Sequence, residues 1–166
     1  MKEMTEQQAL LKLSALCAQA EHCSYEMTEK MRRWGLPDEA QARIMARLTQ
    51  ERYIDDERYS RLFVREKIKF NKWGRKKVAQ ALMAKRIDHE TMQRVLDDVD
   101  DEDYLAVLRP LLKSKRRQMK PMTPYEATSR LVRFALGRGF TMDLIRQCID
   151  VTDEIDDDGE ENQFLA

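Results

Sequence analysis

The chain has 166 residues, of which 42% are apolar and 36% are charged, with only five Gly and four Pro. Strong helix formers dominate and β-branched residues are scattered, which excludes a β-rich fold and predicts an all-α fold. No apolar run reaches the roughly 18 residues that a membrane span needs, and three cysteines without a secretory signal indicate a reduced, cytoplasmic protein.

Three segments carry one apolar pattern, beginning at Met27, Val78 and Leu131, which lie 51 and 53 residues apart. In each, apolar residues follow at four, nine and seventeen positions after the first. Such self-similarity is typical of stacked supersecondary units. We therefore predict an elongated, curved tandem array of three three-helix repeats, at 1–54, 55–102 and 103–152. An acidic segment at 153–166 follows, and its composition predicts disorder.

The first repeat is predicted to begin with a helix over 5–22. Ser24 is expected to be the N-cap of a second helix, which Gly35 ends because Gly adopts the left-handed conformation without penalty. Pro37 is expected at the first position of a third helix that runs to about Arg52.

In the second repeat, a helix through Tyr59 is expected to end near Asn71, followed by a turn at 73–74. A helix over Val78 and Leu82 comes next, and Asp88 is expected to cap the last helix. Arg86 stands where the other two repeats have Gly35 and Gly139, so we predict that Arg86 adopts the left-handed conformation at a cost of about 1 kcal/mol.

The third repeat is predicted to begin with a helix that is interrupted or bent near Pro110. Residues 119–124 contain two prolines and are expected to form an extended linker. A second helix is predicted from Glu126 to Leu136 and stopped by Gly139, and Thr141 is expected to cap the third.

The sequence contains no catalytic constellation. We therefore predict that the protein has no enzymatic activity and binds no cofactor. His22 and His89 lie in polar stretches, and no Gly-rich phosphate loop or nucleophile motif occurs. Cys17 and Cys148 fall at apolar helical positions typical of buried thiols, and Cys23 has no partner at zinc-ligand spacing. The acidic runs lack the pattern of a calcium loop, so no metal site is predicted.

The net charge is zero, but the charges are segregated along the chain. Two segments, named here the basic blocks, have charged residues that are almost all Lys or Arg: Arg61–Arg86 and Arg109–Arg138. Two other segments are acidic: Asp97–Asp103 and Asp150–Glu161. A charge run is ordinarily a solvated face, yet uniform sign in two successive repeats favours a stripe that binds a polyanion or an acidic partner. The candidate contact residues are Arg65, Lys67, Lys69, Lys72, Arg75, Lys76, Lys77, Lys113, Lys115, Arg116, Arg117, Lys120, Arg133 and Arg138.

Trp73 lies in a loop within the first basic block. Its indole could serve as a stacking platform for a base. It could equally fill the interface between two repeats, and this second interpretation is favoured.

The string Tyr53-Ile54-Asp55-Asp56-Glu57-Arg58-Tyr59, with the segments Gly74–Ile87 and Leu131–Phe140, resembles the RecX family, regulators of the bacterial RecA recombinase. The resemblance covers roughly residues 8–152, although Arg86 replaces the usual Gly and the acidic segment is not a family feature. It implies three three-helix repeats and a monomer that binds in the groove of the RecA–DNA filament. It further implies inhibition of strand exchange, ATP hydrolysis and co-protease activity, without catalysis or cofactor.

Two other function classes remain open. Three-helix units resemble helix-turn-helix folds, so the chain could be a stand-alone nucleic-acid-binding module that contacts single- or double-stranded DNA directly. Strong, steeply salt-dependent binding to naked DNA would favour that class. A purely structural scaffold would be favoured if charge reversal in the basic blocks changed nothing.

Overall fold

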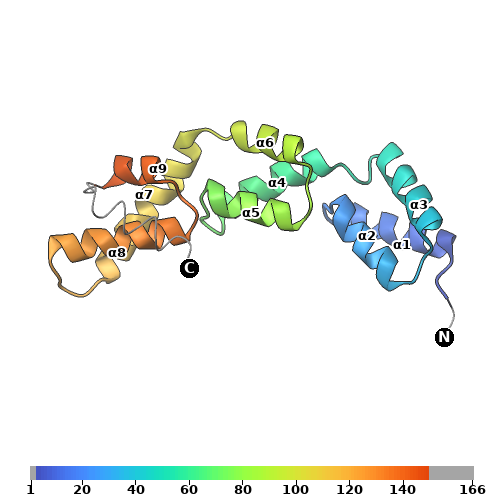
Figure 1. Cartoon of the computed structure of the whole chain (residues 1–166), viewed down its shortest axis with the longest axis horizontal. Helices are drawn as coiled ribbons and strands as arrows, with labels where there is room; N and C mark the ends of the chain where they lie inside the picture. The colour runs from blue at the N-terminus through green and yellow to red at the C-terminus, as the bar shows by residue number, and fades with distance from the viewer. Residues whose placement is uncertain (1–2, 150–166) are drawn as a thin grey trace. The chain divides into compact units, whose positions relative to one another are not determined.

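The computed structural model describes residues 3–149, and this part of the chain contains nine α-helices and no strand (Figure 1). The predicted all-α fold is therefore confirmed. The predicted acidic segment at 153–166 lies outside the described residues. The helices are α1 (Glu6–Gln19), α2 (Ser24–Arg33), α3 (Asp38–Gln50), α4 (Asp56–Lys69), α5 (Arg75–Ala84), α6 (His89–Asp97), α7 (Asp101–Gln118), α8 (Pro124–Gly137) and α9 (Met142–Cys148).

Helix starts are fixed by reciprocal capping. In α1, the Thr5 hydroxyl accepts the N–H of Gln8 at 3.1 Å, and the Gln8 side chain accepts the N–H of Thr5 at 3.0 Å. Thr123 and Glu126 form the same pair of bonds at α8. Asp88 accepts the N–H of Thr91 at 3.3 Å, which confirms its predicted role at α6.

Three predicted helix limits were wrong. Ser24 is already the first residue of α2, because the carboxylate of Glu26 accepts the N–H of Cys23 at 3.0 Å and makes Cys23 the N-cap. Pro37 is the N-cap of α3, one position before the predicted place. Pro124 is the first residue of α8, where its missing N–H has no helical partner to lose.

Helix α7 continues through Pro110, so the predicted interruption was wrong, and the alternative of a bend stays a prediction. A proline in a helix interior removes one backbone hydrogen bond and costs about 3 kcal/mol. Leu105, Leu108 and Leu112 are each at most 4% exposed on the same helix. Burying such side chains contributes about 1.5–3 kcal/mol each, so packing outweighs the local cost.

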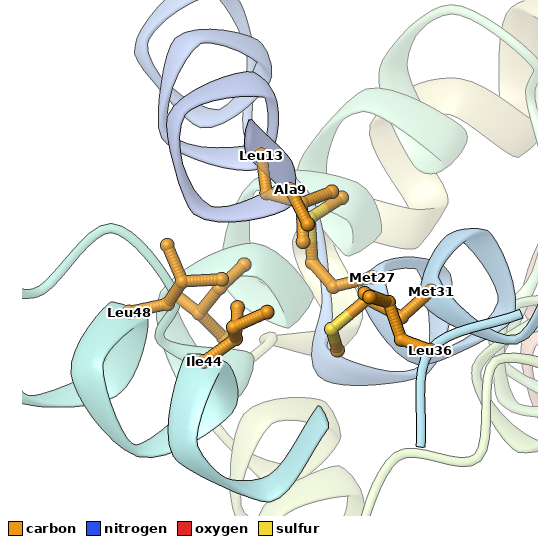
Figure 2. Close-up of a cluster of buried hydrophobic side chains, with 8 residues drawn as sticks. Ala9, Leu13, Met27, Met31, Leu36, Ile44 and Leu48 are labelled. Atoms are coloured by element: carbon orange, nitrogen blue, oxygen red, sulfur yellow. The ribbon is translucent and has the colours of Figure 1, made fainter. Parts of the chain in front are cut away.

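The first three helices enclose one apolar core (Figure 2). Each helix contributes a pair of side chains four residues apart, as a helical face requires, and Leu36 and Ile54 come from the segments that follow α2 and α3. The buried members are Ala9, Leu13, Met27, Met31, Leu36, Ile44, Leu48 and Ile54. All four apolar positions of the first repeat pattern therefore face this core: Met27, Met31, Leu36 and Ile44.

The described chain divides into two compact units that do not follow the repeat limits. The first contains the described residues up to Phe63 together with Leu82–Val95. The second contains Val64–Ala81 and the described residues from Leu96 onward. All three divisions fall inside helices, one each in α4, α5 and α6, so the middle repeat contributes residues to each unit.

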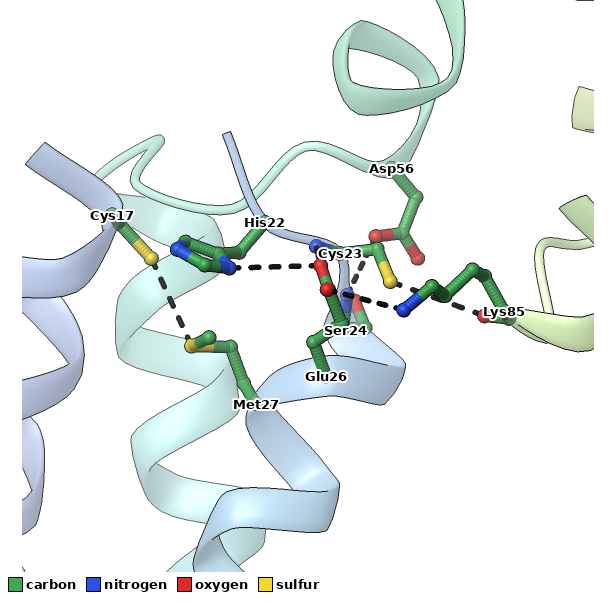
Figure 3. Close-up of polar contacts among 8 residues, drawn as sticks. All are labelled: Cys17, His22, Cys23, Ser24, Glu26, Met27, Asp56 and Lys85. Carbon is green, nitrogen blue, oxygen red and sulfur yellow. Dashed lines mark hydrogen bonds and ion pairs between the residues drawn. The ribbon is translucent and has the colours of Figure 1, made fainter. Parts of the chain in front are cut away.

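In the first unit, the turn that ends α5 packs on the N-terminal turn of α2, a contact named here the first joint (Figure 3). The Lys85 ammonium lies 3.3 Å from the Glu26 carboxylate, and the Cys23 thiol points to the Lys85 carbonyl at 4.0 Å. The Arg86 guanidinium lies 5.2 Å from the Tyr25 ring centroid. A thiol–carbonyl contact, an ion pair and a cation–π contact together stabilise this joint.

In the second unit, the turn that ends α8 packs on the N-terminal turn of α5, named here the second joint. The N–H of Gly74 donates to the Arg138 carbonyl at 2.8 Å, and the N–H of Lys76 donates to the Gly139 carbonyl at 3.0 Å. A Cβ on Gly74 would lie 2.3 Å from the nitrogen of Phe140. The two backbones approach this closely because Gly74 and Gly139 carry no side chain.

The left-handed conformation predicted at Arg86 is confirmed. Its φ is 54°, and Gly35 and Gly139 have φ of 73° and 94°. In all three repeats the next residue donates its N–H back into the helix end: Leu36 to Met31, Ile87 to Leu82 and Phe140 to Ala135, at 3.1–3.2 Å. This bond and the left-handed residue before it are the features of a Schellman-type end. The repeated pattern therefore encodes one repeated turn.

Candidate functional site

All of the basic residues predicted to make contacts lie in the second unit. They come from α4, α5, α7, α8 and the loops that follow these helices. Within this unit the second joint brings the two basic blocks together, because the Arg138 guanidinium donates to the Asn71 carbonyl at 3.1 Å. Lys72, beside Asn71, belongs to the first block, and Arg138 closes the second.

Trp73 forms the first of two cation–aromatic clusters. The ammonium groups of Lys67 and Lys77 lie 5.2 and 5.0 Å from its ring centroid, and the indole is half-buried. Lys67 comes from α4 and Lys77 from α5, both in the middle repeat. Both cations thus belong to the same repeat as the ring. The favoured interpretation, that Trp73 fills the interface between two repeats, stays a prediction.

Phe134 forms the second cluster. The Lys115 ammonium and the Arg138 guanidinium lie 4.9 and 5.3 Å from its ring centroid. Each such contact contributes about 0.5–1 kcal/mol at an exposed site. Arg138 touches both Phe134 and the loop that carries Trp73, so the two clusters form one connected surface, named here the cation–aromatic surface.

A hollow of about 720 Å³ lies beside Phe134, in the bend between α7 and α8. The exposed side chains of Lys120, Arg130 and Arg133 line it with a single acid, Glu126, which is engaged in the α8 capping box. Its apolar lining comes from Phe134 and from Met119, Pro121 and Met122. The hollow thus offers several cations around an aromatic floor.

Arg130 and Phe134 were not among the predicted contact residues. Arg130 occupies the repeat position of Lys77, 53 residues further on, so the repeat alignment could have identified it. Phe134 has no aromatic counterpart in the other repeats, where Lys30 and Ala81 stand, and only its place in the fold distinguishes it.

Several of the predicted contact residues lie outside the two cation–aromatic clusters. Arg75 is engaged within the fold, because its guanidinium lies 2.6 Å from the Asp97 carboxylate and donates to the Leu96 carbonyl at 3.2 Å. Lys69 lies over the exposed ring of Phe70, with 5.5 Å between ammonium and centroid. The structure leaves the remaining members exposed: Arg65, Lys72, Lys76, Lys113, Arg116 and Arg117.

The Cys23 thiol is buried, whereas those of Cys17 and Cys148 are only partly buried, less than predicted. Burial raises the pKa of the Cys23 thiol to about 11, and it also raises the pKa of Cys17 and of Cys148. A thiol is a nucleophile or metal ligand only as the thiolate. Within residues 3–149, no group of three or more His, Cys, Asp or Glu side chains is arranged to hold a metal ion. In the same range, no helix has the length and apolarity to cross a membrane.

Two family models match this chain. Residues 55–96 match the second three-helix domain of RecX, and residues 101–149 match the third. The chain belongs to the RecX family. Membership confirms the predicted family and the helical-repeat fold, and it marks the chain as a member of a family of regulatory proteins.

Curated relatives extend the similarity over most of the chain. The regulatory protein RecX of Lactobacillus delbrueckii is 30% identical over 165 residues, which span 95% of this chain and 60% of that protein. The RecX proteins of Halorhodospira halophila and Pseudomonas entomophila are 28% and 27% identical, and the matches cover 88% and 89% of their lengths. The chain therefore spans about 60% of the Lactobacillus delbrueckii relative but nearly nine-tenths of the other two.

Two solved RecX structures share the fold. The crystal structure of RecX from Lactobacillus salivarius matches with a TM-score of 0.79 and 17% identity over 94% of this chain and 97% of that one. A second RecX crystal structure matches with a TM-score of 0.80 and 17% identity, over 88% and 73% of the two chains.

Proposed function

We propose that this protein is an inhibitory regulator that binds in the groove of a RecA-type recombinase filament on DNA. In this role it acts as a monomer in the cytoplasm and restrains strand exchange, ATP hydrolysis and co-protease activity. Membership in a family of regulatory proteins supports the general role. The cation–aromatic surface is the observation that supports a nucleoprotein target.

The chemistry of this surface suits a nucleoprotein target. Lysine and arginine side chains attract phosphate and acidic protein surface, and the attraction steers association over several ångströms. The half-buried rings of Trp73 and Phe134 add planar faces on which a base or a partner side chain can stack. Bases and phosphates are accessible together where a filament holds its DNA.

The proposed mechanism is competition for the groove. A repeat protein can contact neighbouring subunits of a filament at once, so its second contact becomes intramolecular. Modest individual contacts then give high overall avidity. A bound regulator blocks entry of a second DNA strand and holds adjacent subunits in one arrangement, which slows every activity that needs subunit rearrangement.

Reversing the charge of three basic residues that line the hollow beside Phe134 tests this proposal. The variant with Lys120, Arg130 and Arg133 replaced by Glu is compared with the parent as an inhibitor of recombinase ATPase on single-stranded DNA. All three side chains are exposed, so each change should alter stability by no more than about 0.5 kcal/mol. We expect inhibition to be lost while the far-ultraviolet circular dichroism spectrum is unchanged.

The matched control reverses three exposed arginines of the first unit, Arg43, Arg47 and Arg52. It changes the net charge by the same amount and removes only exposed ion pairs, to Glu6 and Glu51, that contribute little. If the hollow variant inhibits as well as the parent, the cation–aromatic surface is only a solvated face. If the control fails equally, overall charge rather than this surface is responsible.

The alternative function is a stand-alone nucleic-acid-binding module, favoured by the same basic surface. A salt series separates the two. A binding module would hold naked duplex DNA strongly, with a slope of about −0.9 in log K against log salt for each phosphate contacted. A filament regulator would bind the filament more tightly than naked DNA at the same salt concentration. Removing residues 153–166 should leave filament binding intact or tighten it, since their acids compete for cations.

A further inference from the structure

The two joints use the same repeat positions. Counting along the repeats, Lys85 corresponds to Arg138 and Cys23 to Gly74, and the carbonyls of Lys85 and Arg138 face the thiol of Cys23 and the N–H of Gly74. One position further on, Arg86 contacts Tyr25, and Gly139 contacts Lys76 at the corresponding place. Each joint therefore places the turn that ends a repeat's second helix on the N-terminal turn of another repeat's second helix.

The first repeat has the same turn at Trp34–Gly35, and no helix start among residues 3–149 packs on it in this way. Its geometry matches the other two, with Gly35 at φ 73° and the N–H of Leu36 bonded to the Met31 carbonyl at 3.2 Å. Within residues 3–149, no group donates a hydrogen bond to the Trp34 or Gly35 carbonyl. A Cβ on Gly35 would meet no atom within 4 Å, whereas one on Gly139 would lie 2.5 Å from Lys77.

A hollow of about 630 Å³ lies beside this free turn. Met4, Leu11 and Trp34 supply its apolar lining, and Leu11 is 64% exposed. Tryptophan is enriched among the residues that contribute most to binding in protein interfaces, and here its half-buried ring adjoins the exposed Leu11. The hollow therefore extends the free turn into a surface large enough to seat a helix end.

The charge of this surface selects its occupant. Arg33 and Lys12 line the hollow beside one acid, Glu3, and the last turn of α2 also carries Lys30 and Arg32. The end of α2 has the partial negative charge of a helix C-terminus, which attracts the positive N-terminal end of another helix. In the first joint, Glu26 in the first turn of α2 pairs with Lys85 of the docked turn.

We propose that the Trp34–Gly35 turn and its hollow dock the N-terminal end of a partner protein's helix that carries a carboxylate in its first turn. Backbone N–H groups of that helix donate to the Trp34 and Gly35 carbonyls, and its carboxylate pairs with Arg33 or Lys12. An apolar side chain of the partner packs on Leu11 and Trp34. The inference rests on the proposed function in taking this helix to belong to the recombinase.

In a second copy of the chain, the N-terminal turns of the three second helices are not available to this surface. The N-terminal turns of α2 and α5 are already occupied in the two joints. In the third repeat, Ala127 and Ser129 hold the positions of Cys23 and Tyr25, and they are only 2% and 7% exposed. Helix α8 also begins four residues earlier in the repeat than α2 and α5 do, at Pro124, and its first turn extends past that position.

The test is a binding comparison with three probes: recombinase filament on single-stranded DNA, recombinase alone, and single-stranded DNA alone. The double variant Leu11→Glu, Arg33→Glu is compared with the parent. We expect filament and free recombinase to bind about tenfold more weakly, as loss of an apolar anchor and a charge pair implies. Binding to DNA alone should change by less than about twofold, because one exposed cation is lost.

The control variant Met83→Glu, Arg52→Glu makes the same charge change and places Glu at an equally exposed apolar position, since Met83 is 62% exposed. It should bind all three probes as the parent does. Unaltered recombinase binding by the double variant of the hollow, with a parent that binds, overturns this inference alone. A parent that binds neither form of recombinase overturns the proposed function as well.

Two further outcomes would assign a different occupant. An equal loss of binding to DNA alone would make the surface a nucleic-acid site. Self-association of the parent in sedimentation, abolished by Leu11→Glu, would make the occupant a second copy. Either result overturns the inference.

Discussion

The N–H of Gly74 donates to the carbonyl of Arg138 at 2.8 Å, across 64 residues of chain. The bond forms because neither Gly74 nor Gly139 has a side chain to separate the two turns. The same positions in the first joint are Cys23 and Arg86, where side-chain contacts replace the backbone pair. The two joints thus join the same repeat positions through different contacts, backbone hydrogen bonds in one and side-chain contacts in the other.

Gly139→Ala should destabilise the protein much more than Gly35→Ala. Both have left-handed φ, so each substitution incurs about 1 kcal/mol of backbone strain. At Gly139 the new methyl would also lie 2.5 Å from backbone and Cβ atoms of Lys77, adding about 1–3 kcal/mol of overpacking. Urea denaturation of the two variants measures the difference. Equal losses would show that the second joint separates at little cost.

Arg86→Gly should leave stability nearly unchanged in the parent but raise it in a Tyr25→Leu background. Glycine removes about 1 kcal/mol of left-handed strain, and in the parent it also removes the cation–π contact with Tyr25, worth about 0.5–1 kcal/mol. Once Tyr25 is absent, only the strain is relieved. A double-mutant cycle by thermal unfolding measures this coupling. A coupling energy of zero would mean that the Tyr25 contact contributes nothing.

Glu26→Gln should destabilise the protein near neutral pH and have little effect in acid. Burial raises the pKa of Glu26, but the N–H of Cys23 and the ammonium of Lys85 outweigh it, and the pKa is lowered from 4.5. A lowered native pKa contributes stability above the unfolded pKa and loses it as the pH falls through the native value. We expect a difference of about 0.5–1.5 kcal/mol at pH 7.

The check on Glu26 is denaturant unfolding of parent and variant from pH 7 down to about pH 3. The gap between the two should narrow below the ordinary value of 4.5. The matched control is Glu29→Gln, whose pair with the exposed Arg32 is a local contact within α2. A gap that stays constant with pH would mean that Glu26 acts through shape and not through charge.

Truncation after Asp103 should expose the amide hydrogens of Gly74 and Lys76 to exchange. In the full chain both donate to carbonyls of the turn at Arg138–Gly139, which the truncation removes. Much of the stability of repeat proteins comes from contacts between neighbours, so the fragment should also melt at lower temperature. Hydrogen exchange read by mass spectrometry tests this. Unchanged protection at 74–76 would contradict the second joint.

The sequence was sufficient for the features that repeat. The left-handed Arg86 followed from its alignment with two glycines, and the helices followed from apolar spacing. Features set by one local competitor were missed. Cys23 became the N-cap of α2 because the Glu26 carboxylate bonds its N–H, whereas propensity favours Ser24. Pro110 sits inside α7 because buried leucines outweigh its local cost.

The candidate site was predicted only in part, because its geometry depends on tertiary contacts. The basic residues were visible in the sequence, but the contact of Arg138 with both Phe134 and Asn71 arises from the second joint. The same applies to Arg75, which the sequence pattern groups with its basic neighbours and the fold pairs with Asp97. The sequence shows where the charged residues are along the chain, but not which residues lie next to them in the fold.

The close approach in the second joint carries a consequence for how related sequences diverge. A side chain gained at position 74 or at position 139 alone meets backbone atoms and would be removed by selection. The first joint shows that the same two repeat positions accept Cys23 and Arg86 together, once ring and carboxylate contacts take over. Among descendants of one ancestral repeat, these two sites should therefore change as a pair, and an alignment should record them as covarying.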